Sequence, residues 1–518
     1  MRRNTTIAVT PTGRIMPVIG ISLMTIVSAV VGLNVALPDI ARATGATQTQ
    51  LTWIIDAYTV VFAALLFFAG ALGDRFGRKP LLLAGLTIFG LAAVAGAFVD
   101  TPTGLIAVRA AMGLGAAAVM PTTLSVITTS FPEEERPRAI GVWVGIAGAG
   151  AVVGLFITAI MLELFAWQSF FWLNAALAAV SVVGTLVVVP DSVDEHPPAV
   201  DVVGGVLTLV GMGLLVFGII EGPERGWTDS ITLVALVGGA AGLAAFVWWE
   251  LRREQPLLDP RLFAVRGFSV GSLAIAVTFF CWFGLIFSIL QYLQFVIALS
   301  PLEAALRMLP IPFLLIPTAR MAPRLAARFG FRHLVPLGMV LLAVGLYVVS
   351  LSQVDLNYPV FALGLLIGAA GMGLSGTPAT TAVTEALPAS KQGVASAMND
   401  TARELGSALG IAVLGSTLNQ VYRDGLVDQV AGLPQQAADA ILGSVAFTTS
   451  PELAQLGERG QQLAELARQS FVDGVSAALV VAAGVALVTA ALVLAFAPRR
   501  DRQGVDAPVR ADGDAPRR

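Results

Sequence analysis

A single carboxylate interrupts a long apolar stretch of the chain. Asp56 lies in residues 53–70, which read "WIIDAYTVVFAALLFFAG". A carboxylate near the centre of a bilayer costs about 3 kcal/mol on insertion scales. An ionisable residue at such a position points to function by default. Asp56 is therefore the first candidate for a group that binds and releases a proton.

Arg109 is the predicted partner of Asp56. If both residues begin spans that run from the outer to the inner side, each lies about five residues, or roughly 8 Å, below the outer edge. Burial and a neighbouring arginine shift a carboxyl pKa in opposite directions. A change in either one can therefore load or release a proton. A fixed structural ion pair, or an Asp that only faces outer water, is the alternative.

Other reactive side chains are few. The one cysteine, Cys281, excludes an internal disulfide and a thiolate-rich metal site. The two histidines, His196 and His333, are far apart and neither begins an HExxH motif. Lys79 and Lys391 are the only lysines and neither ends a GxxxxGK[ST] phosphate loop. We expect no cofactor, no metal, no ATP site and no enzymatic activity.

The composition is that of an integral membrane protein. Of 518 residues, 56% are hydrophobic and 13% charged, and the mean hydropathy is +0.81, whereas a soluble domain has about 25% charged residues. The net charge of -3 argues against a nucleic-acid partner. A helical span needs roughly 20 apolar residues. The predicted spans are 16–38, 51–72, 80–99, 104–130, 138–162, 169–190, 202–220, 230–250, 268–298, 304–322, 333–352, 357–378, 394–418 and 471–497.

The span order and the arginine positions predict the organisation of the chain. Arginines concentrate in alternate loops, which places both termini in the cytoplasm. The expected segments are a cytoplasmic N-terminus (1–15), a six-helix bundle (16–190), a cytoplasmic linker (191–201), two inserted helices (202–250), a second six-helix bundle (268–498) that contains an extracellular loop (419–470), and a disordered cytoplasmic tail (499–518). Within the loop, a Ser-Pro start at 450 and leucines on one face predict a helix on the outer surface.

Two turns repeat a short string at matching places in the span order. "RFGRK" at 75–79 follows the second span and "RFGFR" at 328–332 follows the tenth. If the two inserted spans are set aside, each turn follows the second helix of a six-helix half. Two related bundles around a central site are typical of transporters.

The first of these turns carries a cluster of glycines and charges. Its sequence is "GALGDRFGRKP", residues 70–80. Small residues allow close helix packing and a glycine permits a tight reversal. Asp74 can pair with Arg75 or Arg78, which follow it. The residues that form this candidate cytoplasmic gate are Gly70, Gly73, Asp74, Arg75, Gly77 and Arg78. A turn that only sets the topology is the alternative.

This stretch resembles the GxLxDRxGRR signature of the major facilitator superfamily. "RAAMGLGAAAVMP" at 109–121 resembles that family's fourth-helix motif, and "NVALPDI", "WIIDAY", "QYLQFVIALSPLEA" and "NDTARELGSALGIAVLGS" resemble its fourteen-helix drug:proton antiporter branch. The resemblance implies an all-α membrane fold of two six-helix bundles plus two inserted helices. It also implies a monomeric, proton-driven exporter of amphipathic or lipophilic molecules that works by alternating access in the plasma membrane.

Some positions depart from the branch pattern. Ala29 stands where the branch has a helix-1 acid, and Leu155 replaces the proline of the helix-5 GPxxGG motif. A uniporter or symporter of a metabolite or lipid is therefore an alternative, and a membrane receptor or membrane enzyme is an alternative from another class. Asp400, Arg403 and Glu404 begin the thirteenth span. They form either a solvated first turn or the inner mouth of the cavity.

Overall fold

The computed structural model describes residues 12–132, 134–192, 200–387, 392–431, 433–449, 453 and 457–498. Regular structure in these residues is helical, with no strand. Most of the predicted N-terminal segment and linker, Lys391 and the predicted tail lie outside the described residues. The helices before the inserted pair are α1 (Thr12–Val31), α2 (Leu33–Thr44), α3 (Gln48–Phe76), α4 (Arg78–Gly96), α5 (Pro102–Ser130), α6 (Arg136–Leu164) and α7 (Ser169–Val188).

The second part of the chain repeats this succession of long helices. The inserted pair is α8 (Val202–Arg225) and α9 (Ser230–Glu250). The remaining elements are η1 (Pro260–Ala264), α10 (Arg266–Gln291), the π-helix η2 (Tyr292–Val296), α11 (Pro301–Arg307), α12 (Pro310–Phe329), α13 (Phe331–Ser350), α14 (Tyr358–Glu385), α15 (Gln392–Leu426), α16 (Gln435–Gly443), η4 (Val445–Thr449) and α18 (Glu458–Phe496).

Each of the fourteen predicted spans corresponds to a long helix or a pair of consecutive helices. Among the described residues, 12 helices are long and apolar enough to cross a membrane. The other two are α6 and α15, with 29 and 35 residues. They are long enough to cross as well, because a helix rises about 1.5 Å per residue. The observed helices are consistent with fourteen spans.

Two predicted elements are divided differently in the structure. The first span, predicted as 16–38, is divided at Gly32 and continues as α2 to Thr44. The ion pair between Arg42 and Asp39, 3.0 Å long, accompanies this polar extension, which an apolar count cannot detect. Gly45, with φ of 69°, ends the helix.

The second of these elements is the predicted surface helix over 450–469. Its second part belongs to α18, a single helix of 39 residues that continues into the last span. No proline interrupts the sequence from Glu458 to Phe496. Ser450 and Pro451, the predicted start, lie outside the described residues.

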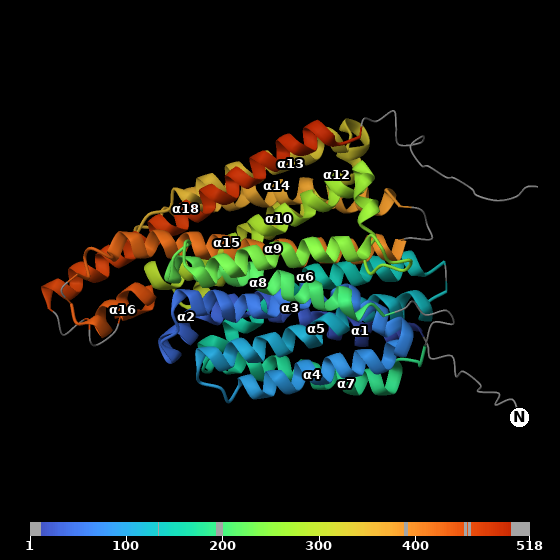
Figure 1. Ribbon diagram of the computed structural model, residues 1–518, viewed down its shortest axis with the longest axis horizontal. Coiled ribbons are helices and arrows are strands. Elements are labelled where there is room, and N and C mark those ends of the chain that lie inside the picture. The colour runs from blue at the N-terminus through green and yellow to red at the C-terminus, as the bar shows by residue number, and fades with distance from the viewer. Residues whose placement is uncertain are drawn as a thin grey trace, which may run out of the picture.

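The helices form two bundles with the inserted pair beside them (Figure 1). The first bundle contains α1 to α7 and the second contains α10 to α18. Helix α8 packs on α9 and also contacts α3 and α15, one helix from each bundle. We call the end at which α1 begins and α18 ends the terminal end. The opposite end, which carries α16, is the loop end (Figure 1).

The two repeated turns share a backbone conformation. Gly77, between α3 and α4, has φ 105° and ψ 140°. Gly330, between α12 and α13, has φ 80° and ψ 152°. A positive φ in this region favours glycine because it lacks a Cβ. The matching geometry supports the predicted relation between the two halves of the chain.

The bundles meet at the loop end. Four hydrogen bonds between described residues join them, and each lies at that end. The donors and acceptors are Asn419 Nδ2 and Thr49 Oγ1 (3.0 Å), Gln294 Nε2 and the Val35 carbonyl (3.1 Å), Arg42 Nη2 and the Gln294 carbonyl (3.3 Å), and the Leu302 amide and Glu163 Oε1 (3.1 Å). The loop end of the central interface is therefore closed in this conformation.

Candidate functional site

Asp56 is fully buried on α3. The helix begins with a capping box in which Thr47 and Gln50 bond each other's backbone amides. Asp56 follows two turns later. Its Oδ1 accepts a hydrogen bond of 2.8 Å from Thr59 Oγ1, while its Oδ2 is buried without a hydrogen-bond partner. One carboxylate oxygen is thus free to take a proton without breaking an existing bond.

Arg109 is fully buried on α5. Its Nε donates a hydrogen bond of 3.0 Å to the carbonyl of Ile54 on α3. Its guanidinium lies over the ring of Tyr58, 4.2 Å from the centroid. Both terminal nitrogens are buried without a hydrogen-bond partner. The backbone and an aromatic face therefore hold this cation, and no carboxylate of the described residues pairs with it.

The predicted pair of Asp56 and Arg109 is not formed in this conformation. The bond to the Ile54 carbonyl holds Arg109 against α3, two residues before Asp56. However, Asp56 and Tyr58 are two residues apart, which is about 200° around an α-helix. Arg109 packs on the Tyr58 side of α3, so Asp56 points away from it. The depth of each residue in the membrane could be counted along the sequence, whereas the rotation of α3 about its axis could not.

The face of α3 that carries Asp56 is turned toward α15 and α8. Thr49, seven residues earlier and on the same face, bonds Asn419 of α15. Val60, four residues later, belongs to an apolar cluster with Ala412 of α15 and Val216 of α8. Asp56 therefore lies at the interface of the two bundles, covered on one side by the inserted helix.

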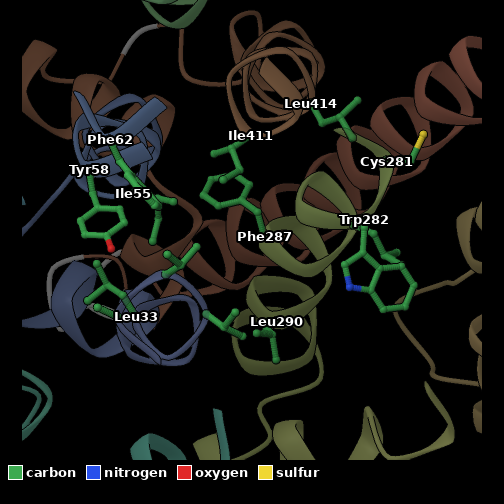
Figure 2. Close-up of a cluster of buried hydrophobic side chains, with 14 of the residues drawn as sticks. Leu33, Ile55, Tyr58, Phe62, Cys281, Trp282, Phe287, Leu290, Ile411 and Leu414 are labelled. Carbon is green, nitrogen blue, oxygen red and sulfur yellow. The ribbon is translucent and has the colours of Figure 1, made fainter. Parts of the chain in front are cut away.

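Apolar side chains from both bundles fill the interface beside Asp56. Figure 2 shows Leu33 and Ile55 of the first bundle close to Phe287, Leu290 and Ile411 of the second. All five are buried. This packing closes the interface between the bundles where α3 faces α10.

Asp400 is buried, while Arg403 and Glu404 are half-buried, and none of the three lies in the first turn of its helix. Helix α15 begins at Gln392, so these residues are in its third and fourth turns. Asp400 is buried, 3.9 Å from Arg403 Nη1, and accepts a bond of 3.3 Å from Asn399. Arg403 lies over Phe279 at 4.6 Å. Glu404 Oε2 is buried without a hydrogen-bond partner.

Tyr58 holds Arg109 against α3, and the sequence analysis did not single it out. Its ring centroid lies 4.2 Å from the Arg109 guanidinium. Its hydroxyl donates a hydrogen bond of 3.2 Å to the Ile26 carbonyl on α1. The signal was present in "WIIDAY", where an amphipathic ring stands two residues after the buried acid.

The glycine-rich turn connects three helices of the first bundle. Asp74 pairs with Arg78 at 3.2 Å. The Arg78 amide donates to the Ser192 carbonyl (3.0 Å), and Lys79 donates to the Leu186 carbonyl (3.1 Å) at the end of α7. The other turn residues make looser contacts. A Cβ added at Gly70 would lie 3.8 Å from Pro121 of α5, and one added at Gly73 would lie 3.6 Å from Thr122. Arg75 lies 5.9 Å from the centroid of the Phe76 ring.

A carboxylate of the inserted pair also holds α3. Trp53 donates a hydrogen bond of 3.0 Å from its indole nitrogen to Glu221 Oε1 on α8. Arg225 donates to the other oxygen of Glu221 at 2.8 Å. Trp53 precedes Asp56 by one helical turn. No sequence signal pairs residues that are 168 positions apart.

The sequence profile of the Major Facilitator Superfamily matches residues 18–411. The chain is 31% identical over 487 residues to the multidrug resistance protein Stp of Mycobacterium tuberculosis (strain CDC 1551 / Oshkosh), covering 92% of this chain and 89% of Stp. It is 34% identical to the multidrug efflux pump LfrA of Mycolicibacterium smegmatis (strain ATCC 700084 / mc(2)155), covering 89% and 91% of the two chains.

Solved structures share the fold. A bacterial homolog to the human lysosomal transporter Spinster, solved in an inward-facing and unoccupied conformation, superposes with a TM-score of 0.62. The two chains are 20% identical, and the match covers 94% of this chain and 99% of that one. With long helices in two bundles, a matching family profile and relatives along almost its whole length, this multi-pass membrane protein belongs to the Major Facilitator Superfamily.

Proposed function

We propose that this protein exports amphipathic or lipophilic small molecules across the plasma membrane by alternating access, driven by protons that move inward. Several relatives carry names that state multidrug resistance or efflux. The observation that carries the proposal is Asp56, which is fully buried at the interface of the bundles with one carboxylate oxygen unpartnered. We infer transport and not catalysis, with a monomer as the working unit.

The orientation follows from charge. The turn with Arg75, Arg78 and Lys79 lies at the terminal end, and the positive-inside rule places such a turn in the cytoplasm. Both termini are then cytoplasmic and the loop end is extracellular. Since the bonds between the bundles lie at the loop end, the described conformation is closed to the outside.

Energy from protons is sufficient for export. One proton moving down a potential of 100 mV supplies about 2.3 kcal/mol. Asp56 is the proposed proton site because loading it removes a buried charge. Arg109 is the proposed modulator through Tyr58, whose ring lies under the Arg109 guanidinium two residues after Asp56 on α3. Asp400, Arg403 and Glu404 are proposed to line the inner part of the path.

Two positions favour uncoupled transport as the second candidate. Ala29 is fully buried where an acid is usual in the branch, and α6 runs unbroken from Arg136 to Leu164 with Leu155 in its interior. A uniporter needs neither an acid in the first helix nor a proline in α6. One transport measurement in vesicles decides between proton-driven export and uniport.

The test is transport of ethidium into everted vesicles under an imposed pH gradient. Wild type and the control Asp424→Asn, an exposed loop-end acid bonded by Gln420, should accumulate ethidium. Asp56→Asn should lose gradient-driven accumulation while ethidium still binds. Equal accumulation by Asp56→Asn would end the assignment of Asp56, and gradient-independent equilibration by wild type would favour uniport.

A further inference from the structure

The face of α3 between the loop end and Asp56 is polar. Thr49, Thr52 and Asp56 are spaced so that all three lie on one side of the helix, and all are buried. Across the interface, α15 presents Ser416 and Asn419, which are also buried. We call these five residues the polar ladder. It extends over about 10 Å along α3, from the loop end to the buried acid.

The ladder is built from direct contacts between the bundles. Asn419 donates a hydrogen bond of 3.0 Å to Thr49 Oγ1 at its outer end. One turn deeper, Gly415 lies against the hydroxyl oxygen of Thr52, 3.0 Å from the position of an added Cβ. The absence of a side chain at Gly415 therefore leaves the Thr52 hydroxyl in contact with α15. Asp56 is the next position on the same face.

The interface changes character beyond Asp56. Toward the terminal end, the same face of α3 carries Val60, Ala63 and Ala64. These residues pack with Ala408 and Ala412 of α15 in one apolar cluster. Met212, Val216 and Ile220 of α8 complete that cluster. The side chains next to Asp56 are thus polar in the direction of the loop end and apolar in the opposite direction.

Several polar atoms near the ladder have no hydrogen-bond partner although they are buried. These are Asp56 Oδ2, Ser416 Oγ and both amide atoms of Gln48. A buried unpartnered polar group costs about 1–3 kcal/mol, and such groups in proteins are normally satisfied by ordered water. Polar side chains with spare bonding capacity, aligned between a buried acid and one surface, can support a file of water molecules.

We infer that the polar ladder is the path by which protons from the loop end reach Asp56, and that the bond between Asn419 and Thr49 closes it. This inference rests on the proposed proton coupling. When the bundles separate at the loop end, that bond breaks and the hydroxyls of Thr52 and Ser416 guide water to Asp56. The apolar cluster below Asp56 stops the same water from reaching the terminal end.

The transport test uses near-isosteric substitutions. Thr52→Val and Ser416→Ala remove one hydroxyl each from the ladder. The matched controls are Thr489→Val and Ser181→Ala. Thr489 is a buried threonine that, like Thr52, bonds the carbonyl four residues earlier, and the Ser181 hydroxyl, like that of Ser416, is buried without a partner.

The variants are reconstituted in proteoliposomes, and ethidium transport under a pH gradient is compared with ethidium binding. Both ladder variants should lower the initial gradient-driven rate about tenfold, a change of about 1.4 kcal/mol in the barrier, with binding and both controls unchanged. Wild-type rates in both ladder variants overturn the inference and leave the proposed function intact.

A second measurement does not depend on coupling. In a Cys281→Ala background, Ser416→Cys should react with a small charged thiol reagent added at the loop end, because the ladder is wetted from that side. Ala412→Cys, one turn deeper on the same face of α15 and inside the apolar cluster, should not react. Equal reactivity of the two cysteines, or none, overturns the inference. Failure of wild type to couple protons contradicts the proposed function and the proton role of the ladder, whereas the cysteine reactivities still test whether water enters the ladder from the loop end.

Discussion

The guanidinium of Arg109 lies 4.2 Å from the centre of the Tyr58 ring, and its Nε bonds the Ile54 carbonyl at 3.0 Å. Both side chains are fully buried. A cation with so few polar partners depends on that ring, because a desolvated cation–π contact contributes about 2 kcal/mol.

Replacing the Tyr58 ring should therefore lower the stability of the protein more than removing only its hydroxyl. We expect Tyr58→Leu to lower the thermal stability of the purified protein, whereas Tyr58→Phe keeps the aromatic face and loses only the bond to Ile26. Tyr347→Leu, on an exposed helix surface, is the control. The measurement is the melting temperature in detergent. Equal melting of Tyr58→Leu and Tyr58→Phe would show that the ring does not stabilise Arg109.

Asp74→Asn should slow transport without destabilising the protein. The Asp74–Arg78 pair is partly exposed, and such pairs contribute roughly 0–1 kcal/mol to stability. Its proposed role is in the transport cycle, where an ion pair at a helix junction can favour one of two states. The rate of ethidium transport should fall severalfold at unchanged expression and melting temperature.

The matched control for Asp74→Asn is Glu465→Gln. Glu465 forms an exposed pair of 3.6 Å with Arg468 at the opposite end of the molecule. Wild-type transport by correctly inserted Asp74→Asn would reduce this turn to a topological signal.

Gly410→Ala should be strongly destabilising. A Cβ at Gly410 meets the carbonyl oxygen of Phe280 in the backbone of α10. Backbone cannot move aside as a flexible side chain can, and overpacking of this kind costs about 1–3 kcal/mol or more. Gly213→Ala, in the middle of α8, meets nothing within 4 Å and should be tolerated. Comparison of folded yield and melting temperature tests this, and similar values for both variants would contradict it.

Glu221→Ala should loosen the inserted pair from the first bundle. Glu221 accepts bonds from Trp53 and from the exposed Arg225. Its removal leaves the part-buried Trp53 indole N–H unpaired, at a cost of about 1–3 kcal/mol. The control is Glu224→Ala, an exposed neighbour on the same helix. Cysteines placed on α3 and α8 should crosslink less rapidly in Glu221→Ala. Unchanged crosslinking would mean that the apolar cluster alone holds the pair.

The sequence by itself determined the membrane class, the positions of the long helices and the repeated turns. Apolar length is a local property, and a span can be recognised without knowing its neighbours. The glycines at 77 and 330 were equally local signals, because a positive φ restricts the residue type wherever the turn lies. Asp56 was found for the same reason, since a carboxylate in an apolar run is conspicuous.

Only the tertiary structure decided which groups face one another. The sequence placed Asp56 and Arg109 at one level, but the rotation of α3 turns Asp56 toward α15 and directs Tyr58 to Arg109. Contacts such as Thr49 with Asn419 and Trp53 with Glu221 join residues 370 and 168 positions apart. Rotation and long-range pairing depend on how all the helices pack at once. Composition and spacing along a single helix contain no record of that packing.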